Sequence, residues 1–206
     1  MNPILYSFRR CPYAMRARMA LDAAQIPITH REILLKNKPA KMIEASSKGT
    51  VPVLVLDEDH VLDESMDIMH WALAINDPEH WQRDPALADK LISRNDGQFK
   101  HHLDRYKYAS RYEPEMAGHH RHEGLLILQD LEQRLTKKPF LGGETAFLGD
   151  IALFPFVRQF RIADPVDFDH QPLPRLQSWL NHFLQDARFA RVMKKHPLYH
   201  EGDNDE

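Results

Sequence analysis

The sequence contains a single cysteine, Cys11, among its 206 residues. One cysteine cannot form an internal disulfide bond, which is typical of proteins kept in a reducing compartment. The chain also lacks any apolar run near the roughly 20 residues that cross a bilayer. Its first residues, MNPILYSF, have neither the charged region nor the long apolar region of a secretory signal. We therefore expect a cytoplasmic protein that makes no use of a membrane.

An excess of charge of either sign is absent as well. Lys and Arg number 27 against 30 Asp and Glu, so the formal net charge is only -3. Nucleic acids and anionic membranes select proteins with a basic excess or basic blocks. Neither is expected as a partner. The 43% apolar and 28% charged composition is that of an ordinary globular protein, long enough to bury a real core.

The first third of the chain alternates strand and helix patterns. Segments rich in β-branched and aromatic residues predict strands, and apolar residues at helical spacing predict helices. A helical crossover makes the first two strands parallel, and the last two strands form a hairpin. The expected elements are a strand at 4–8, a helix at 12–24, a strand at 26–33, strands at 51–56 and 61–63, and a helix at 64–75.

The remaining two-thirds of the chain shows helical patterns only. The stretch NDPEHWQRDP marks a linker, and one long segment after it carries leucines at helical spacing from Leu125 to Leu135. The fold class is therefore an α/β domain (βαβ-ββα) followed by an all-α domain. We expect an α/β domain at residues 1–76, a linker at 77–86, a helical domain at 87–200 and an acidic tail at 201–206.

The setting of the one cysteine favours reactivity. Cys11 follows the expected first strand and stands directly before Pro12, at the start of the expected helix. Unpaired N–H groups and the positive end of the helix dipole favour a thiolate there. Arg9, Arg10 and Arg16 add positive charge. A free cysteine is more often a small buried apolar residue, yet these surroundings indicate a reactive thiol whose resolving partner comes from outside the chain.

Four motifs carry a resemblance to a known family. They are RRCPYAMRARMAL, LLKNKP, TVPVL and DES. In their order and spacing they resemble the cysteine-type glutathione transferases, most closely the omega class and its bacterial relatives. The resemblance implies a thioredoxin-like N-terminal domain, a helical domain that forms the cleft for the second substrate, and a homodimer. It also implies glutathione as the cosubstrate, without a metal.

The same resemblance assigns a site residue by residue. Cys11 is the implied catalytic thiol. The implied glutathione-binding residues are Tyr13, Lys36, Val51, Pro52, Glu64 and Ser65. A cis bond before Pro52 turns the backbone of Val51 toward the ligand, which then pairs like an added strand. At the start of a helix, Ser65 and free N–H groups bind the γ-glutamyl carboxylate, while Glu64 takes the ammonium. The alternative for Lys36 is that it is an exposed lysine in a polar loop and does not bind glutathione.

The implied reaction is thiol transfer through a mixed disulfide on Cys11, acting on a small electrophilic or disulfide substrate such as a glutathionyl adduct or a dehydroascorbate-like compound. Two alternatives stay open. One is conjugation of glutathione with Tyr6 activating its sulfur, although the place of Tyr6 in the middle of a strand favours a core role. The other is a non-catalytic relative that uses the same two domains for binding or regulation.

Two features of the helical part are judged structural. In GHHRHEG (residues 118–124), no cysteine or carboxylate stands at zinc-site spacing, so a solvated helix face or a lining of the substrate cleft is favoured over a metal site. In TAFLGDIALFPF, Phe147 stands where the family has a hydroxyl cap. Asp150 still reaches the backbone N–H of residue 147. The missing hydroxyl costs about 1 kcal/mol unless Thr145 or water replaces it.

Overall fold

A computed structural model of the chain describes residues 2–202, which form two compact units. Unit 1 holds the residues up to Glu79 and those from Ala187 onward, and unit 2 is His80–Asp186. The expected helical domain at 87–200 therefore differs from unit 2, because residues 187–200 join unit 1. Of the expected tail at 201–206, residues 203–206 lie outside the described part of the chain.

The sheet of unit 1 has four strands in the order β2-β1-β3-β4. β1 and β2 are parallel, with Ile4 opposite Thr29. β3 is antiparallel to β1 and forms a hairpin with β4, in which Leu54 faces Leu62. This is the expected βαβ-ββα arrangement. The strands are β1 (Ile4–Ser7), β2 (Thr29–Glu32), β3 (Val53–Val55) and β4 (Val61–Leu62).

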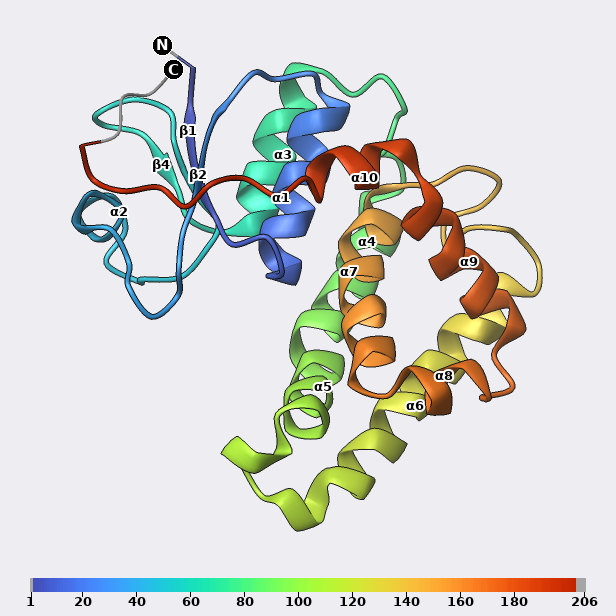
Figure 1. The fold of residues 1–206 in the computed structure, drawn as a ribbon. Coiled ribbons are helices and arrows are strands. Elements are labelled where there is room, and N and C mark those ends of the chain that lie inside the picture. Colours follow the sequence, from blue (N-terminus) through green and yellow to red (C-terminus); the bar gives the residue numbers. More distant parts are fainter. Residues whose placement is uncertain (1, 203–206) are drawn as a thin grey trace. The chain divides into compact units, whose positions relative to one another are not determined.

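Helices α1 (Pro12–Ala23) and α3 (Ser65–Ile75) pack together and lie side by side in Figure 1. The predicted apolar face of α3, from Ile68 to Leu73, is buried as its spacing requires. The short helix α2 (Ala40–Ala45) contacts β3 and contributes Met42 to a core cluster. The expected site residues lie at the starts of α1 and α3 (Cys11, Tyr13, Glu64 and Ser65), directly before β3 (Val51 and Pro52) and between β2 and α2 (Lys36).

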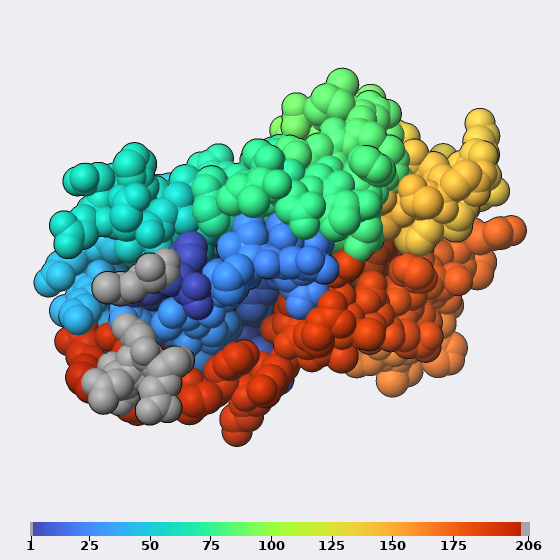
Figure 2. All heavy atoms as spheres, turned by 90° about the horizontal axis from the view of Figure 1, so that it is seen from above, coloured from blue at the N-terminus to red at the C-terminus, as the bar shows by residue number. Residues whose placement is uncertain are grey.

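The residues from Ala187 onward return to unit 1. Helix α10 (Ala187–Val192) packs on α1, and Leu198 forms a parallel bridge with Glu32 at the free edge of β2. In Figure 2 the red C-terminal residues lie against the blue surface of this unit. These long-range contacts place α10 and the segment after it in unit 1.

Unit 2 is built from helices, as expected. The predicted leucine stripe from Leu125 to Leu135 is buried along the inner face of α6. Among residues 2–202, no helix combines the length and apolar character that crossing a membrane requires. The helices are α4 (Pro85–Arg94), α5 (Lys100–Lys107), α6 (Ala117–Leu135), α7 (Leu148–Ala163), α8 (Pro165–Asp169) and α9 (Pro174–Gln185), and a π-helical segment (Asn95–Phe99) joins α4 to α5.

Asp150 is the buried polar centre of unit 2. Its carboxylate accepts the backbone N–H of Phe147 at 3.1 Å, which confirms the surviving half of the capping arrangement. It also accepts the N–H of Leu141 at 2.9 Å and the indole N–H of Trp179 at 2.7 Å. One side chain thus ties the start of α7 to a preceding loop and to α9. Burial raises the pKa of Asp150 to about 6, against the effect of these three hydrogen bonds.

Candidate active site

Cys11 is the N-cap residue of α1, in extended backbone conformation with φ -71° and ψ 123°. Its carbonyl oxygen accepts the N–H of Met15 at 3.0 Å, and Pro12 occupies the first helical position. The half-buried thiol contacts the carbonyl oxygen of Val51, with Sγ and O 3.6 Å apart. Two of the predicted site residues, Cys11 and Val51, therefore touch.

Arg18 is a charged neighbour of Cys11 that the sequence analysis missed. The guanidinium is only 4% exposed, and it donates to Ser7 Oγ and, at 2.8 Å, to the carbonyl oxygen of Arg9. Burial lowers its pKa to about 10, while the charges of Glu32 and Cys11 act in the opposite direction. The group stays ionised at neutral pH. The sequence did contain a signal for this neighbour. Arg18 is seven positions after Cys11, which is about two helical turns, so the two residues lie on the same face of the helix.

Two of the three arginines expected to act on Cys11 lie over aromatic rings. Arg10 lies over the ring of Phe8, 5.4 Å from its centroid. Arg16 is fully buried and lies 5.4 Å from the centroid of the Tyr13 ring. Tyr13 lies in the first turn of α1, two residues after Cys11, and its ring contacts this buried cation. The role of Tyr13 in binding stays a prediction.

Glu32 balances the positive charge in this region. Its carboxylate accepts the backbone N–H of Arg9 at 2.7 Å and lies 3.2 Å from His30 Nε2. Burial alone would raise the pKa of Glu32. The hydrogen bonds from His30 and Arg9, together with the charges of His30 and Arg18, lower it below its ordinary value.

The bond between Val51 and Pro52 is cis, as the resemblance implied. Both residues are buried and directly precede β3. Because β3 is an inner strand of the sheet, the backbone of Val51 is held against the start of α1.

Glu64 and Ser65 stand at the start of α3. Glu64 is the exposed N-cap residue, and Ser65 is buried in the first turn. Lys48, which the sequence analysis did not single out, places its ammonium 2.6 Å from Glu64 Oε1 and 2.9 Å from Asp63 Oδ1. These contacts raise the pKa of Lys48. The ammonium of Lys48 thus pairs with Glu64, the residue that was predicted to bind the amino group of glutathione.

Lys36 lies in the exposed turn between β2 and α2. Its role in binding stays a prediction. Tyr6, the rival to Cys11, is only 2% exposed, and its hydroxyl accepts a hydrogen bond from the buried Arg31. The tyrosine packs with Val51 and Val53 in the core cluster, which confirms the expected packing role.

Two family models match the chain. The model described as "Glutathione S-transferase, N-terminal domain" covers residues 5–80, and the model described as "Glutathione S-transferase, C-terminal domain" covers residues 127–182. They occur in the order in which the α/β and helical units follow one another. The chain belongs to the glutathione S-transferase family.

Proteins similar to this chain carry several names. Pyrimidodiazepine synthase from Drosophila melanogaster is 29% identical, over 88% of this chain and 76% of that protein. Glutathione S-transferase omega-1 from Mus musculus is 42% identical, over 30% of this chain and 26% of that protein. Glutaredoxin 2 from Escherichia coli K12 is 25% identical, over 80% and 87% of the two chains. One of these three names is that of a glutathione S-transferase, and the other two name different proteins.

Solved structures agree on the fold. A glutathione transferase family member from Pseudomonas fluorescens, solved with two glutathione molecules bound, superposes with a TM-score of 0.78. The two chains share 18% identity, over 93% of this chain and 92% of that one. At this identity the likeness concerns the fold of the chain.

Proposed function

We propose that the protein is a glutathione-dependent thiol transferase whose nucleophile is Cys11. The observation that carries the proposal is the thiol at the N-cap of α1, beside the backbone of Val51 and under the charge of the buried Arg18. The helix terminus and the guanidinium both favour a thiolate. Relatives named omega-1 and glutaredoxin 2 support this class of chemistry.

The reaction runs in two balanced steps. The Cys11 thiolate attacks the glutathionyl sulfur of a mixed disulfide, forming a Cys11–glutathione disulfide and releasing the substrate thiolate, which takes a proton. A second glutathione, as its thiolate, then attacks the glutathionyl sulfur of this intermediate. Oxidised glutathione leaves and the Cys11 thiolate is restored. Overall, the mixed disulfide and one glutathione give the substrate thiol and oxidised glutathione, half of which comes from the mixed disulfide itself.

Glutathione binding is proposed along the edge formed by Val51 and the start of α3. The backbone of Val51 pairs with the tripeptide. Ser65 and the first N–H groups of α3 receive the γ-glutamyl carboxylate. Glu64 receives the ammonium, which displaces Lys48 Nζ from its oxygen. The ammonium of Lys48, once displaced from Glu64, is then proposed to lie close to the γ-glutamyl carboxylate. Tyr13 and Lys36 complete the proposed contacts.

Mass spectrometry of the intact protein after treatment with oxidised glutathione tests the nucleophile directly. We expect one glutathione per chain, removed by reduced glutathione. Because Cys11 is the only cysteine, the adduct has one place to form. Cys11→Ser takes up none, and its reduction of a glutathionylated thiol falls by at least about 10³-fold, as is typical when a nucleophile is removed.

Tyr6→Phe separates this mechanism from tyrosine-activated conjugation. It leaves the adduct and the reductase activity in place, because Tyr6 is a core residue. A Cys11→Ser protein that still reduces the mixed disulfide would overturn the proposal. Retention on immobilised glutathione without any adduct would point instead to a binding protein.

A further inference from the structure

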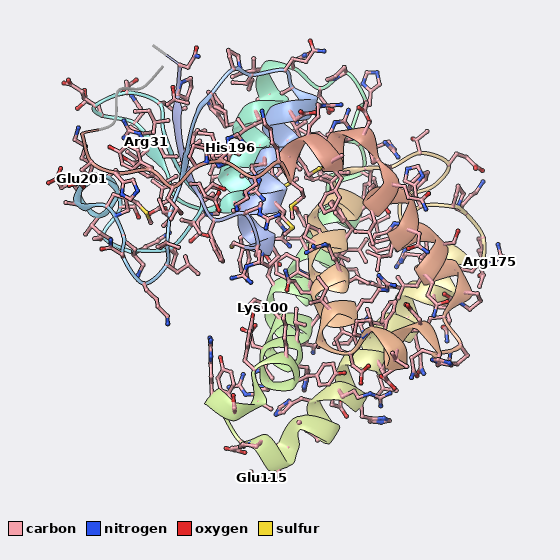
Figure 3. All side chains as sticks on the ribbon, in the orientation of Figure 1. Arg31, Lys100, Glu115, Arg175, His196 and Glu201 are labelled. Atoms are coloured by element: carbon pink, nitrogen blue, oxygen red, sulfur yellow. The ribbon has the colours of Figure 1, made fainter. Side chains whose placement is uncertain are left out.

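Three histidines meet between the first turns of two helices in unit 2. His101 and His102 begin α5, and His120 lies in the first turn of α6. One ligand atom of each lies within 4.8 Å of those of the other two. Figure 3 labels Lys100, which precedes His101, and Glu115, shortly before α6. The GHHRHEG segment was discounted because it lacks ligands at local spacing, but its partners come from α5.

The spacing of the nitrogens suits a single metal ion. His102 Nδ1 and His120 Nδ1 are 2.9 Å apart. Two imidazole nitrogens bound at about 2.0–2.1 Å to one tetrahedral zinc ion stand about 3.3 Å apart, so binding requires this pair to separate by about 0.4 Å. The third ligand, His101, is exposed on α5, so rotation of its side chain brings its nitrogen toward the other two without moving the core.

His120 is buried and His102 is half-buried, and a neutral imidazole has the lone pair that a metal needs. The facing charges come from His119 and Arg105, which oppose a cation, and from the carboxylates of Glu113 and Glu123, which favour one.

We propose that His101, His102 and His120 form a binding site for one divalent transition-metal ion, with zinc as the expected occupant. Imidazole is a preferred ligand of zinc, copper and nickel, and three protein ligands leave a fourth position for water. The ion links α5 to α6 within unit 2. The site shares no residue with the cysteine site of unit 1, so the proposal does not depend on the reaction at Cys11.

The test is zinc titration of the full chain without an affinity tag, after removal of metals with a chelator. Competition with a chromophoric chelator is expected to show one equivalent bound. His101→Ala and His102→Ala are each expected to weaken binding by at least about 100-fold, since each removes a ligand. The matched control is His122→Ala, because His122 is an exposed histidine of α6 outside the cluster; this variant is expected to bind zinc as tightly as the unaltered chain.

A second measurement guards against loss of fold. His101 is exposed, so His101→Ala is expected to keep the far-ultraviolet circular dichroism of the unaltered chain. Zinc raises the melting temperature only of chains that bind it, so the unaltered chain and His122→Ala shift and His101→Ala does not. Several weak equivalents that survive His101→Ala and His102→Ala would overturn the proposal. So would equal affinity in all four proteins.

Discussion

The backbone N–H of Tyr199 donates a hydrogen bond to the carbonyl oxygen of Glu32 at 2.8 Å. This bond extends the edge of β2 with a segment from the far end of the described chain. Around it, the guanidinium of Arg31 lies 4.3 Å from the centroid of the Tyr199 ring, and His196 stacks on His30 with centroids 4.0 Å apart. Figure 3 labels Arg31 and His196 in this region.

Replacing Tyr199 by alanine is expected to lower the free energy of unfolding by about 2 kcal/mol. The change removes an aromatic ring packed on a desolvated cation and against Tyr6. Urea unfolding measures the loss. Tyr199→Phe keeps the ring and the backbone hydrogen bond, so its stability stays within about 0.5 kcal/mol of the unaltered chain. Equal effects of the two changes would contradict this account.

Arg18→Met is expected to slow the alkylation of Cys11 by iodoacetamide at pH 7 by about 5-fold. An interaction of about 1 kcal/mol between the guanidinium and the thiolate corresponds to that factor. Arg18→Lys keeps the charge, so the logarithm of its alkylation rate is expected to fall by less than half as much as that of Arg18→Met. Stopped-flow or mass-spectrometric rates measure both variants. If Arg18→Met reacts as fast as the unaltered chain, the guanidinium does not act on the thiol.

Asp150 is expected to titrate near pH 6 in the folded protein, because burial raises its pKa from 3.8 to about 6. The folded chain then holds a proton that the unfolded chain releases. The stability contributed by this group is therefore complete below about pH 4 and is lost as the pH rises through about 6. The indole N–H of Trp179, bonded to Asp150 Oδ1, reports the ionisation by NMR.

The control for this titration is Asp150→Asn, which keeps the size of the side chain and removes its ionisation. The change in the Trp179 signal near pH 6 disappears in that variant. A midpoint below pH 4 in the unaltered chain would mean that the three hydrogen bonds outweigh burial.

Two glycines of α6 are expected to respond to alanine with opposite signs. A Cβ at Gly124 stands 2.5 Å from Cε2 of Phe160. That ring is 1% exposed, so it has no room to move, and Gly124→Ala destabilises by about 1–3 kcal/mol. At Gly118 a Cβ meets nothing within 4 Å, so Gly118→Ala stabilises by about 0.5 kcal/mol through helix propensity. Thermal unfolding of both variants gives the signs, and a loss at Gly118 or a gain at Gly124 would refute the packing argument.

The α/β part was predictable from the sequence because its order follows from local patterns. Ile4 to Ser7 and Val53 to Val55 are short apolar strands between helices that have clear apolar faces. The return of residues 187–200 to unit 1 was not predictable, because it depends on packing of α10 against α1 and on pairing beside Glu32. Periodicity contains no information on contacts between segments so distant in the chain.

The candidate site was found where motifs are contiguous and missed where partners are distant. Cys11, Pro52 and Ser65 stand in short motifs at helix or strand ends. Lys48 was missed because an exposed lysine in a polar loop has no pattern of its own. The three histidines were missed because they belong to two helices joined by a connection whose path the sequence does not specify.

The return of the chain to its first unit has a consequence for biosynthesis. A ribosome makes β1, α1 and Cys11 before the helical unit, yet Arg18 acquires Met193 as a neighbour, at 3.8 Å, only after residue 193 has been translated. The helical unit is complete before that moment, because it ends at Asp186. The surroundings of Arg18, and through it of Cys11, are therefore completed only after the whole helical unit has been synthesised.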